Sequence, residues 1–389
     1  MFTDRVNSLE PEGAYAVLAR AQALESLGRD IIHLELGQPD FSTPVNVRDV
    51  GIQAILDGQT RYVASAGILR FREIIAEYAG KQRGIKILPE QVVVSPGTQS
   101  GLFFSPLALV SPGDEVIYPD PGFPTYSAVI KVTGGIPVPV PLRVETNFSF
   151  DLNVFDSKIS NRTKLIILNS PSNPTGGVIP FEDLKHIAEK AQKYNAWILS
   201  DEIYARLVFD ELSVPYIAAF DGMQDRTIIV DGFSKTYAMP GWRLGFMIAP
   251  LALAKKLELL IMHSVGCTSA FTQYAGMEAL LGPQNAPVKM VAEYQVRRNR
   301  VVKLLNEIPG VHTQIPSGAF YAFPNIKSFG LTSEEIARRL LDEAGVAVLA
   351  GTDFGEAGEG YLRLAYATSM DKIEAGISRM ADYFSGLNK

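Results

Sequence analysis

The feature that most constrains the fold is an alternation of short apolar runs with longer helix-like segments between about residues 91 and 248. Several runs are apolar almost throughout, which is typical of strands covered by helices on both faces. The pattern predicts an α/β fold with a mostly parallel, helix-flanked sheet. The predicted strands are Gln91–Ser95, Glu115–Tyr118, Ile136–Val140, Lys164–Leu168, Ala196–Ser200, Thr227–Asp231 and Leu244–Ile248. Helices are predicted over Thr98–Val110, Phe181–Tyr194 and Leu251–His263.

The C-terminal third has a different character, with one long helical stretch followed by short strands and helices. This order indicates a smaller α+β domain. We therefore expect a large domain over residues 46–287 and a small one over 288–389, with an N-terminal segment, 1–45, packing against the small domain. The predicted elements of the small domain are helices over Val288–Leu305, Ser333–Ala344 and Asp371–Phe384 and strands over Ala319–Ala322, Val346–Leu349 and Tyr361–Leu364.

Composition excludes several classes of function. The chain has 36 basic and 42 acidic residues, a net charge of -6, so we expect no nucleic-acid partner. The basic cluster of Arg297, Arg298, Arg300 and Lys303 is predicted to be a solvated helix face. Prolines interrupt the longest charge-free stretch, 95–113, so no membrane span is predicted. A single cysteine and no apolar core in residues 1–12 indicate a cytoplasmic protein.

Several catalytic motifs can be tested and rejected. In residues 97–101 the serine is fourth, whereas the nucleophile elbow of serine hydrolases needs it third. The run Ser234-Lys235-Thr236 lacks the glycine that precedes the lysine of a phosphate-binding P-loop. The four histidines form no H-E-x-x-H pattern, and we expect no metal site.

Three polar clusters remain, and each follows a predicted strand. They read Asn-Ser-Pro-Ser-Asn-Pro-Thr-Gly at 169–176, Ser-Asp-Glu-Ile-Tyr at 200–204, and Ser-Lys-Thr-Tyr at 234–237 running on to Pro-Gly-Trp-Arg at 240–243. Ligands of such sheets bind beyond the carboxyl ends of the strands. With Gly-Gln-Pro-Asp-Phe at 37–41 and Arg363, in this order, the chain resembles the class I/II aminotransferases along nearly its whole length. The resemblance implies fold type I and pyridoxal 5'-phosphate as cofactor.

Two of the implied residues have a clear chemical purpose. The cofactor acts as an electron sink when an amine holds it as an imine, which requires a lysine of lowered pKa, and Lys235 matches that position. The ring nitrogen stays protonated only beside a buried carboxylate, and Asp201 matches. The competing interpretations are a solvated surface lysine and a helix-capping aspartate.

The resemblance assigns further contacts to the cofactor. Asn173 and Tyr204 would donate to its phenolate oxygen, although Asn173 could instead be a turn residue before proline. Phe123 would stack on the ring, or belong to the core. Ser234, Arg243 and the helix start formed by Gly97, Thr98 and Gln99 would hold the phosphate. Many relatives carry a serine three residues before the lysine, where this chain has Gly232.

The remaining implied residues concern the substrate and the assembly. Arg363 would clamp the α-carboxylate of the amino acid, unless it is an edge residue of its strand. Gly37, Asn173 and Tyr15 would complete the substrate site. Tyr62 matches a tyrosine that reaches the phosphate from the neighbouring subunit, which implies a homodimer with shared sites.

The function implied is ping-pong transamination between an L-amino acid and a 2-oxo acid, with Lys235, Asp201 and Tyr204 as the catalytic residues. A pyridoxal-phosphate β-lyase or cyclopropane-forming synthase is an alternative, and a non-catalytic cofactor-binding regulator is a distant one. The pocket positions Tyr15, Phe123 and Gln99 are uncharged, which favours aliphatic or aromatic amino acids over aspartate. The sequence identifies no basic residue for a second substrate carboxylate.

Overall fold

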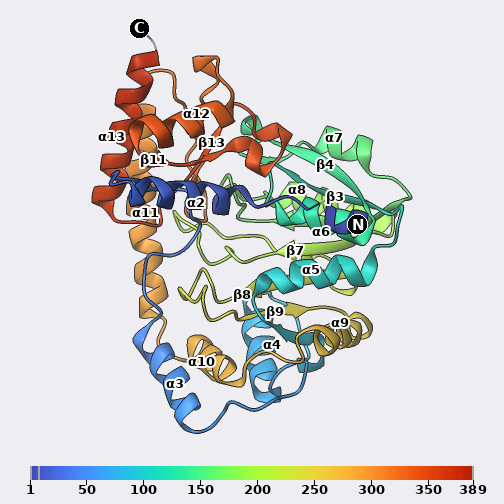
Figure 1. The fold of residues 1–389 in the computed structure, drawn as a ribbon. Helices are drawn as coiled ribbons and strands as arrows, with labels where there is room; N and C mark the ends of the chain where they lie inside the picture. Colours follow the sequence, from blue (N-terminus) through green and yellow to red (C-terminus); the bar gives the residue numbers. More distant parts are fainter. Residues whose placement is uncertain (1, 8, 388–389) are drawn as a thin grey trace.

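The computed structural model describes residues 2–7 and 9–387 and contains one large sheet (Figure 1). Its strand order is β2-β9-β8-β7-β6-β3-β4-β5. Strands β3, β4, β6, β7 and β8 pair in parallel, whereas β9 and β5 run antiparallel to their neighbours. The bounds are β2 Val92–Ser95, β3 Glu115–Asp120, β4 Ile136–Arg143, β5 Ser149–Phe150, β6 Thr163–Asn169, β7 Trp197–Asp201, β8 Thr227–Gly232 and β9 Gly245–Ile248.

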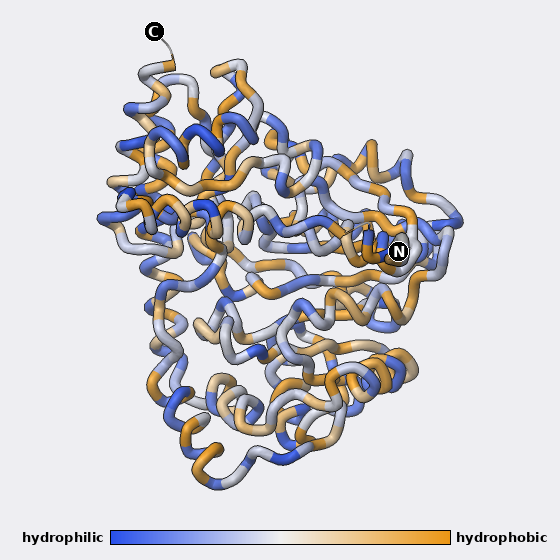
Figure 2. The backbone as a smooth tube through the Cα atoms, viewed as in Figure 1, coloured by the Kyte–Doolittle hydropathy of each residue, from blue (hydrophilic) through white to orange (hydrophobic). Residues whose placement is uncertain are grey.

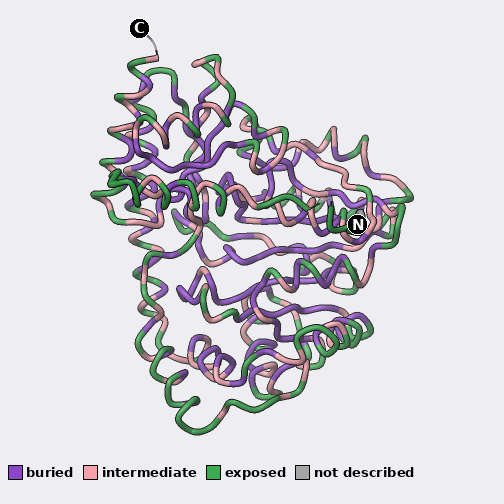
Figure 3. Tube along the Cα trace, viewed as in Figure 1, coloured by how far each residue is buried: buried purple, intermediate pink, exposed green. Residues whose placement is uncertain are grey.

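Helices cover both faces of this sheet, as the apolar strands predict. Successive residues of a strand point to opposite faces. In β6, Leu165 and Ile167 pack with α5 (Thr98–Leu109), α6 (Thr125–Thr133) and α9 (Leu251–Ser264), whereas Ile166 and Leu168 pack with α7 (Leu152–Lys158) and α8 (Phe181–Lys193). Figure 2 shows hydrophobic residues along the central strands, and Figure 3 shows the same strands buried. The central strands therefore lie inside the molecule, whereas the outer strand β4 is partly exposed.

All seven predicted strands and the three predicted helices of this region are present within a few residues. The sequence pattern did not predict the short strand β5, nor several helices whose apolar residues do not form a clear stripe. Near the sheet these are α3 (Val45–Leu56), α4 (Leu69–Arg83) and α10 (Ala270–Leu281), which pack on β2 and β9, together with α6, α7 and the single turn α1 (Asp4–Asn7).

The C-terminal part forms a second, smaller layer of helices and strands beside the sheet (Figure 1). It has a three-stranded sheet in the order β10-β13-β12. Strand β1 (Ile32–His33) crosses from the N-terminal segment to pair in parallel with β11, and α2 (Gly13–Ser26) lies nearby. The bounds are α11 Asn285–Asn306, β10 Tyr321–Ala322, α12 Ser333–Arg339, β11 Val346–Ala347, β12 Leu349–Ala350, β13 Leu362–Ala365 and α13 Met370–Leu387.

Two sequence-based expectations for this part need correction. The strand expected over Val346–Leu349 is two strands, β11 and β12, which belong to different sheets. The expected solvated basic face of α11 is also wrong at two positions, since Arg297 and Arg298 are buried. Arg297 forms an ion pair with Asp40 at 2.8 Å, and Arg298 pairs with Asp210 at 2.6 Å. Periodicity could not reveal this because the acidic partners lie far away in sequence.

The closeness of α5 to the sheet depends on Gly101. A Cβ atom at Gly101 would lie 2.8 Å from Cγ1 of Val230 on β8 and 3.0 Å from Cγ of Met247 on β9. We predict that Gly101→Ala lowers stability by about 1–3 kcal/mol, because overpacking outweighs the better helix propensity of alanine. The control is Gly386→Ala near the end of α13, where a Cβ meets nothing within 4 Å and stability should not fall. Thermal unfolding midpoints test both; a stable Gly101→Ala protein would contradict the packing argument.

Candidate active site

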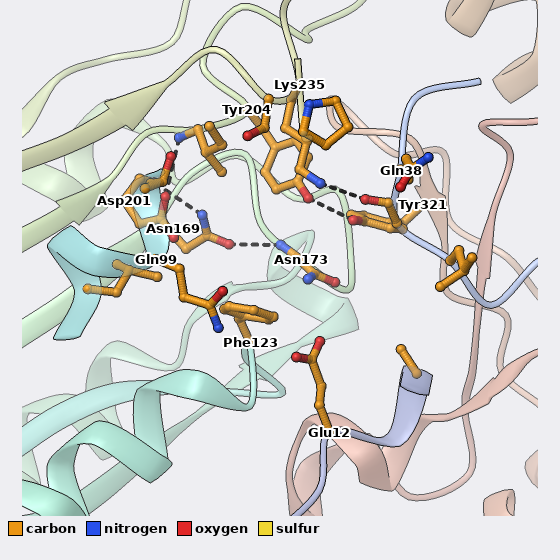
Figure 4. A pocket seen from close by; sticks show the side chains of 18 of the residues that line it. Glu12, Gln38, Gln99, Phe123, Asn169, Asn173, Asp201, Tyr204, Lys235 and Tyr321 are labelled. Carbon is orange, nitrogen blue, oxygen red and sulfur yellow. Dashed lines mark hydrogen bonds between the residues drawn. The ribbon is translucent and has the colours of Figure 1, made fainter. Parts of the chain in front are cut away.

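A cavity of about 340 Å³ lies at the carboxyl ends of β6, β7 and β8, and Figure 4 shows it from close by. The start of α5, the start of α2 and the loop around Gly37 complete its walls, together with Tyr321 and Arg363 from the smaller sheet. The structure brings most of the sequence-predicted site residues into this cavity. They are Tyr15, Gly37, Thr98, Gln99, Phe123, Asn173, Asp201, Tyr204, Ser234, Lys235, Arg243 and Arg363.

Two predicted residues do not line the cavity. Gly97 packs against Arg243, which lines the cavity. A Cβ atom at Gly97 would lie 2.3 Å from Nη2 of Arg243. Tyr62 is 93% exposed and lies outside the cavity of its own chain.

Lys235 follows β8 and its side chain points into the cavity (Figure 4). Its Nζ donates a hydrogen bond to the carbonyl oxygen of Gly37 at 2.5 Å. Burial, with smaller contributions from the positive charges of Arg363 and Arg243, lowers the pKa of Lys235 to about 8. Such an amine is a much better nucleophile and base at neutral pH than a solvated surface lysine.

Asp201 ends β7 and is buried. Its Oδ2 accepts a hydrogen bond from the hydroxyl of Tyr126 at 2.7 Å, and its Oδ1 accepts one from the backbone N–H of Ile203 at 3.3 Å. Desolvation raises the pKa of Asp201 to about 6, while these two hydrogen bonds oppose the rise. The side chain caps no helix, so it is available to a cationic group in the cavity.

Asn169 ties the Asp201 strand to the loop that carries Asn173. The Asn169 side chain donates to the carbonyl oxygen of Asp201 at 3.1 Å and accepts from the backbone N–H of Asn173 at 2.8 Å. The sequence identified Asn169 as the first residue of a polar motif but predicted no role for it. A polar residue at the end of an apolar strand could have indicated that Asn169 belongs to the site.

A second sheet supplies the opposite wall. The hydroxyls of Tyr204 and Tyr321 are 2.7 Å apart and hydrogen bonded. Sequence reasoning missed Tyr321, since an aromatic residue in a short strand looks like core. A Cβ atom at Gly37 would lie 2.2 Å from the Tyr321 hydroxyl, so this close approach requires glycine.

Arg363 lies on β13, the middle strand of the small sheet, and is buried. It is therefore no edge residue. One guanidinium nitrogen donates to Oδ1 of Asn173 at 3.4 Å and another donates to the carbonyl oxygen of Glu35. Its Nε has no hydrogen-bond partner among the described residues. A buried guanidinium with an unused donor is a suitable clamp for a carboxylate.

The start of α5 offers an anion site. The backbone N–H groups of its first turn face the cavity beside Arg243, which adopts a left-handed φ of 51°. The buried hydroxyl of Thr98 has no hydrogen-bond partner among the described residues. A Cβ at Gly232 would lie 2.6 Å from that hydroxyl. Thr98 therefore fills the space that a serine at position 232 would need.

These groups fit pyridoxal phosphate. The cavity holds an amine of lowered pKa, a buried carboxylate that forms no ion pair with the described residues, and a helix start with an arginine and an unpaired hydroxyl. Within residues 2–7 and 9–387, no group of three His, Cys, Asp or Glu side chains is placed to hold a metal ion. None of the described helices is long and apolar enough to cross a bilayer.

Comparison with known proteins agrees with this chemistry. Residues 29–380 match the family "Aminotransferase class I and II". An aspartate aminotransferase of Pyrococcus horikoshii is 40% identical, with 98% of this chain and 97% of the relative covered. An aromatic-amino-acid aminotransferase of Thermococcus litoralis is 39% identical, with 97% of each covered. The structure of Thermus thermophilus aspartate aminotransferase with maleate superposes with a TM-score of 0.94 at 34% identity, covering 98% of this chain and 99% of the other.

The chain belongs to the class I and II aminotransferases. It is a pyridoxal-phosphate-dependent enzyme of fold type I that transfers an amino group between an amino acid and a 2-oxo acid. The sequence-based predictions of fold class, activity and cofactor are confirmed.

The hydrogen bond from Tyr126 to Asp201 suggests a direct test. We predict that Tyr126→Phe lowers kcat about tenfold while the cofactor stays bound, because Asp201 loses a neutral donor that stabilises its ionised form and fixes its orientation. The control is Tyr118→Phe on β3, whose hydroxyl lies outside this cavity and should be dispensable. Steady-state turnover measures both; an equal response of the two variants would contradict the role of the Tyr126 hydroxyl.

Proposed function

We propose that transamination takes place in this cavity, with Lys235 as the residue that moves the proton. The single observation that carries the proposal is that the Lys235 amine shares one cavity with the Asp201 carboxylate and the Arg363 guanidinium. When bound, pyridoxal phosphate supplies a conjugated ring that withdraws electrons from the amino acid Cα. The Nζ atom of Lys235 accepts the proton that leaves Cα of the amino acid. In the reverse half of the reaction, Nζ returns a proton to Cα. Its pKa of about 8 suits both directions near neutral pH.

The proposed role of Asp201 is electrostatic. Its carboxylate pairs with a protonated ring nitrogen, and the cation in turn stabilises the ionised carboxylate against burial. Asn173 and Tyr204 would hold the phenolate oxygen of the cofactor by hydrogen bonds, and Phe123 would pack against its ring. The support is that all four side chains face the same cavity (Figure 4).

The proposed phosphate grip uses the start of α5. The backbone amides near Gly97, Thr98 and Gln99 bind the anion, with Arg243 and Ser234 beside them. The unpaired Thr98 hydroxyl supports this grip, since it can donate to the phosphate. It also compensates for the absence of a serine at position 232.

The proposed substrate grip uses Arg363. Its guanidinium binds the α-carboxylate of the amino acid, with Asn173 held beside it by the 3.4 Å hydrogen bond. Gly37 and Tyr15 line the same region of the cavity. Because Lys235 lines the same cavity, an amino acid bound through its carboxylate to Arg363 would lie within the cavity that holds the Lys235 amine.

We also propose a homodimer with shared sites. A second cavity of about 810 Å³ adjoins the phosphate end of the first and shares Gln38, Pro240 and Arg243 with it. Tyr62 of this chain lies outside it and is almost fully exposed. Tyr62 is an exposed aromatic residue with no packing partner to explain it in the described part of its own chain, and closed two-fold dimers are the commonest assemblies, so we propose that Tyr62 inserts into this cavity of a second copy.

The domain division and the location of the protein are further proposals. We propose that residues 1–45 and 288–389 form one small domain and 46–287 the large one, supported by the pairing of β1 with β11 and the contacts of α2 with β11 and β12. Residues 1, 8 and 388–389 of this division lie outside the described residues. We propose a cytoplasmic location, supported by the single, unpaired Cys267.

The role of Lys235 predicts a loss of covalent attachment. Purified protein should be yellow, and borohydride should fix the cofactor to Lys235. The Lys235→Ala variant should keep the cofactor only non-covalently and lose turnover by about 10²–10⁴-fold, since it lacks the proton-transferring amine. Lys255→Ala, on the exposed face of α9, is the control and should behave like the wild type.

The same preparation separates the two reactions. With an amino acid alone, a β-lyase releases ammonia continuously, whereas an aminotransferase stops after one turnover until a 2-oxo acid is added. Mass spectrometry of the labelled peptide and an ammonia assay give both answers. A label on another lysine would contradict the assignment of Lys235, and acceptor-independent ammonia release would favour the lyase.

The shared-site proposal predicts complementation. Tyr62→Ala and Lys235→Ala homodimers should each be impaired. In a mixed dimer one site takes Lys235 from the first chain and Tyr62 from the second, so that site is wild type. Random pairing of equal amounts restores about a quarter of the sites, and activity should rise accordingly on mixing and refolding. If mixed dimers form and activity does not rise, Tyr62 does not act across the dimer.

A further inference from the structure

The identity of the amino acid substrate is left open by overall similarity. Relatives at 40% and 39% identity are named for aspartate and for aromatic amino acids, respectively. The discriminating information must therefore lie in the few side chains that surround the substrate side chain. In this cavity one of them carries an unexpected charge.

Glu12 lines the active-site cavity and points into it from the side opposite Lys235 (Figure 4). It immediately precedes α2, at the position where an acidic side chain commonly caps a helix. The Glu12 side chain makes no such capping hydrogen bond. It also forms no ion pair with any residue in the described part of the chain, and its carboxylate is half-buried. The positive charges of Arg363 and Lys235 act on this carboxylate from beyond ion-pair distance.

The cations of the cavity are already committed. Its basic side chains are Lys235, Arg243 and Arg363, and the proposed function uses them for the proton, the phosphate and the α-carboxylate. Lys131 lines a separate cavity that shares Phe123 with this one and that also contains Glu10 and Asp353. Among the described residues of the same chain, a second substrate carboxylate would thus meet no free cation in this cavity.

The cavity that Glu12 enters also has apolar lining residues. Ala14, Leu18 and Leu36 line it together with the rings of Tyr15 and Phe123. Such a wall favours the apolar body of an aliphatic or aromatic side chain. A carboxylate among these groups disfavours another negative charge, because like charges in a partly desolvated site repel strongly.

We propose that Glu12 is a specificity-determining residue that excludes dicarboxylic amino acids and leaves the site to substrates with an uncharged, largely apolar side chain. This inference rests on the proposed function, since it takes the cavity as the place where the substrate binds. Glu12 acts by repulsion, so it selects against one class of substrate without contacting the preferred class closely.

The test compares substrates that differ by one charge. The kcat/KM values for L-glutamine over L-glutamate and for L-asparagine over L-aspartate are measured for the wild type and for Glu12→Gln. Removing the charge should lower these ratios at least about tenfold, through a better reaction of the acids. The Glu10→Gln variant is the matched control, because Glu10 is a neighbouring acid that lines the other cavity and should leave the ratios unchanged.

Inhibition gives a second readout that does not require turnover of these four amino acids. Succinate and butanoate differ by one carboxylate, and each is tested as an inhibitor of the best donor. Glu12→Gln should strengthen inhibition by succinate at least about tenfold and leave butanoate nearly unchanged.

The outcomes separate this inference from the proposed function. Equal changes for acids and amides in Glu12→Gln would mean that Glu12 only balances the charge of Arg363, and the inference would be wrong. An unchanged succinate constant in a folded, active variant would also overturn it. A wild-type protein that transaminates no amino acid would instead refute the proposed function itself.

Discussion

The site depends on a geometric constraint of parallel sheets: the carboxyl ends of neighbouring strands meet at one edge. Strands β6, β7 and β8 end at Asn169, Asp201 and Gly232, which lie far apart in sequence but on adjacent strands. The residues that follow them therefore share one cavity. Because helices cover both faces of the sheet, this edge is also where polar groups can be exposed to a ligand while their backbones stay rigid.

Burying charges at such an edge is costly, and the structure compensates most of them. Arg83 lies within 2.6 Å of the Glu202 carboxylate and 3.1 Å of the Asp231 carboxylate, which flank Asp201 in sequence and on the neighbouring strand. Asp201 has only the neutral hydroxyl of Tyr126 and a backbone amide. Of these three carboxylates Asp201 alone forms no ion pair among the described residues, and the proposed pairing with a protonated ring nitrogen would supply the missing cation.

The sequence was sufficient to predict the sheet, the cofactor and most of the side chains that line the cavity, because those residues stand in motifs at strand ends. It was insufficient where a role depends on distant partners. Tyr126 and Tyr321 look like core aromatics until Asp201 and Tyr204 are found beside them, 75 and 117 residues away. Arg297 resembles a surface residue until Asp40 is placed against it. The proposed role of Tyr62 likewise depends on a second copy of the chain, which periodicity cannot address.

In the proposed function, the residues that carry out the reaction and the residue that selects the substrate lie on different structural elements. The chemical groups Lys235, Asp201 and Arg363 stand on or directly after strands, whose hydrogen-bond ladders fix their positions. Glu12 stands at the start of α2, in a segment that no sheet holds. Substitutions on this segment can change the charge of the substrate wall while leaving the strand-borne groups in place. In this proposal a few wall residues determine which amino acid is accepted, whereas the residues at the sheet edge determine the reaction. Two relatives that are equally similar to this chain can therefore differ in substrate and still catalyse the same reaction.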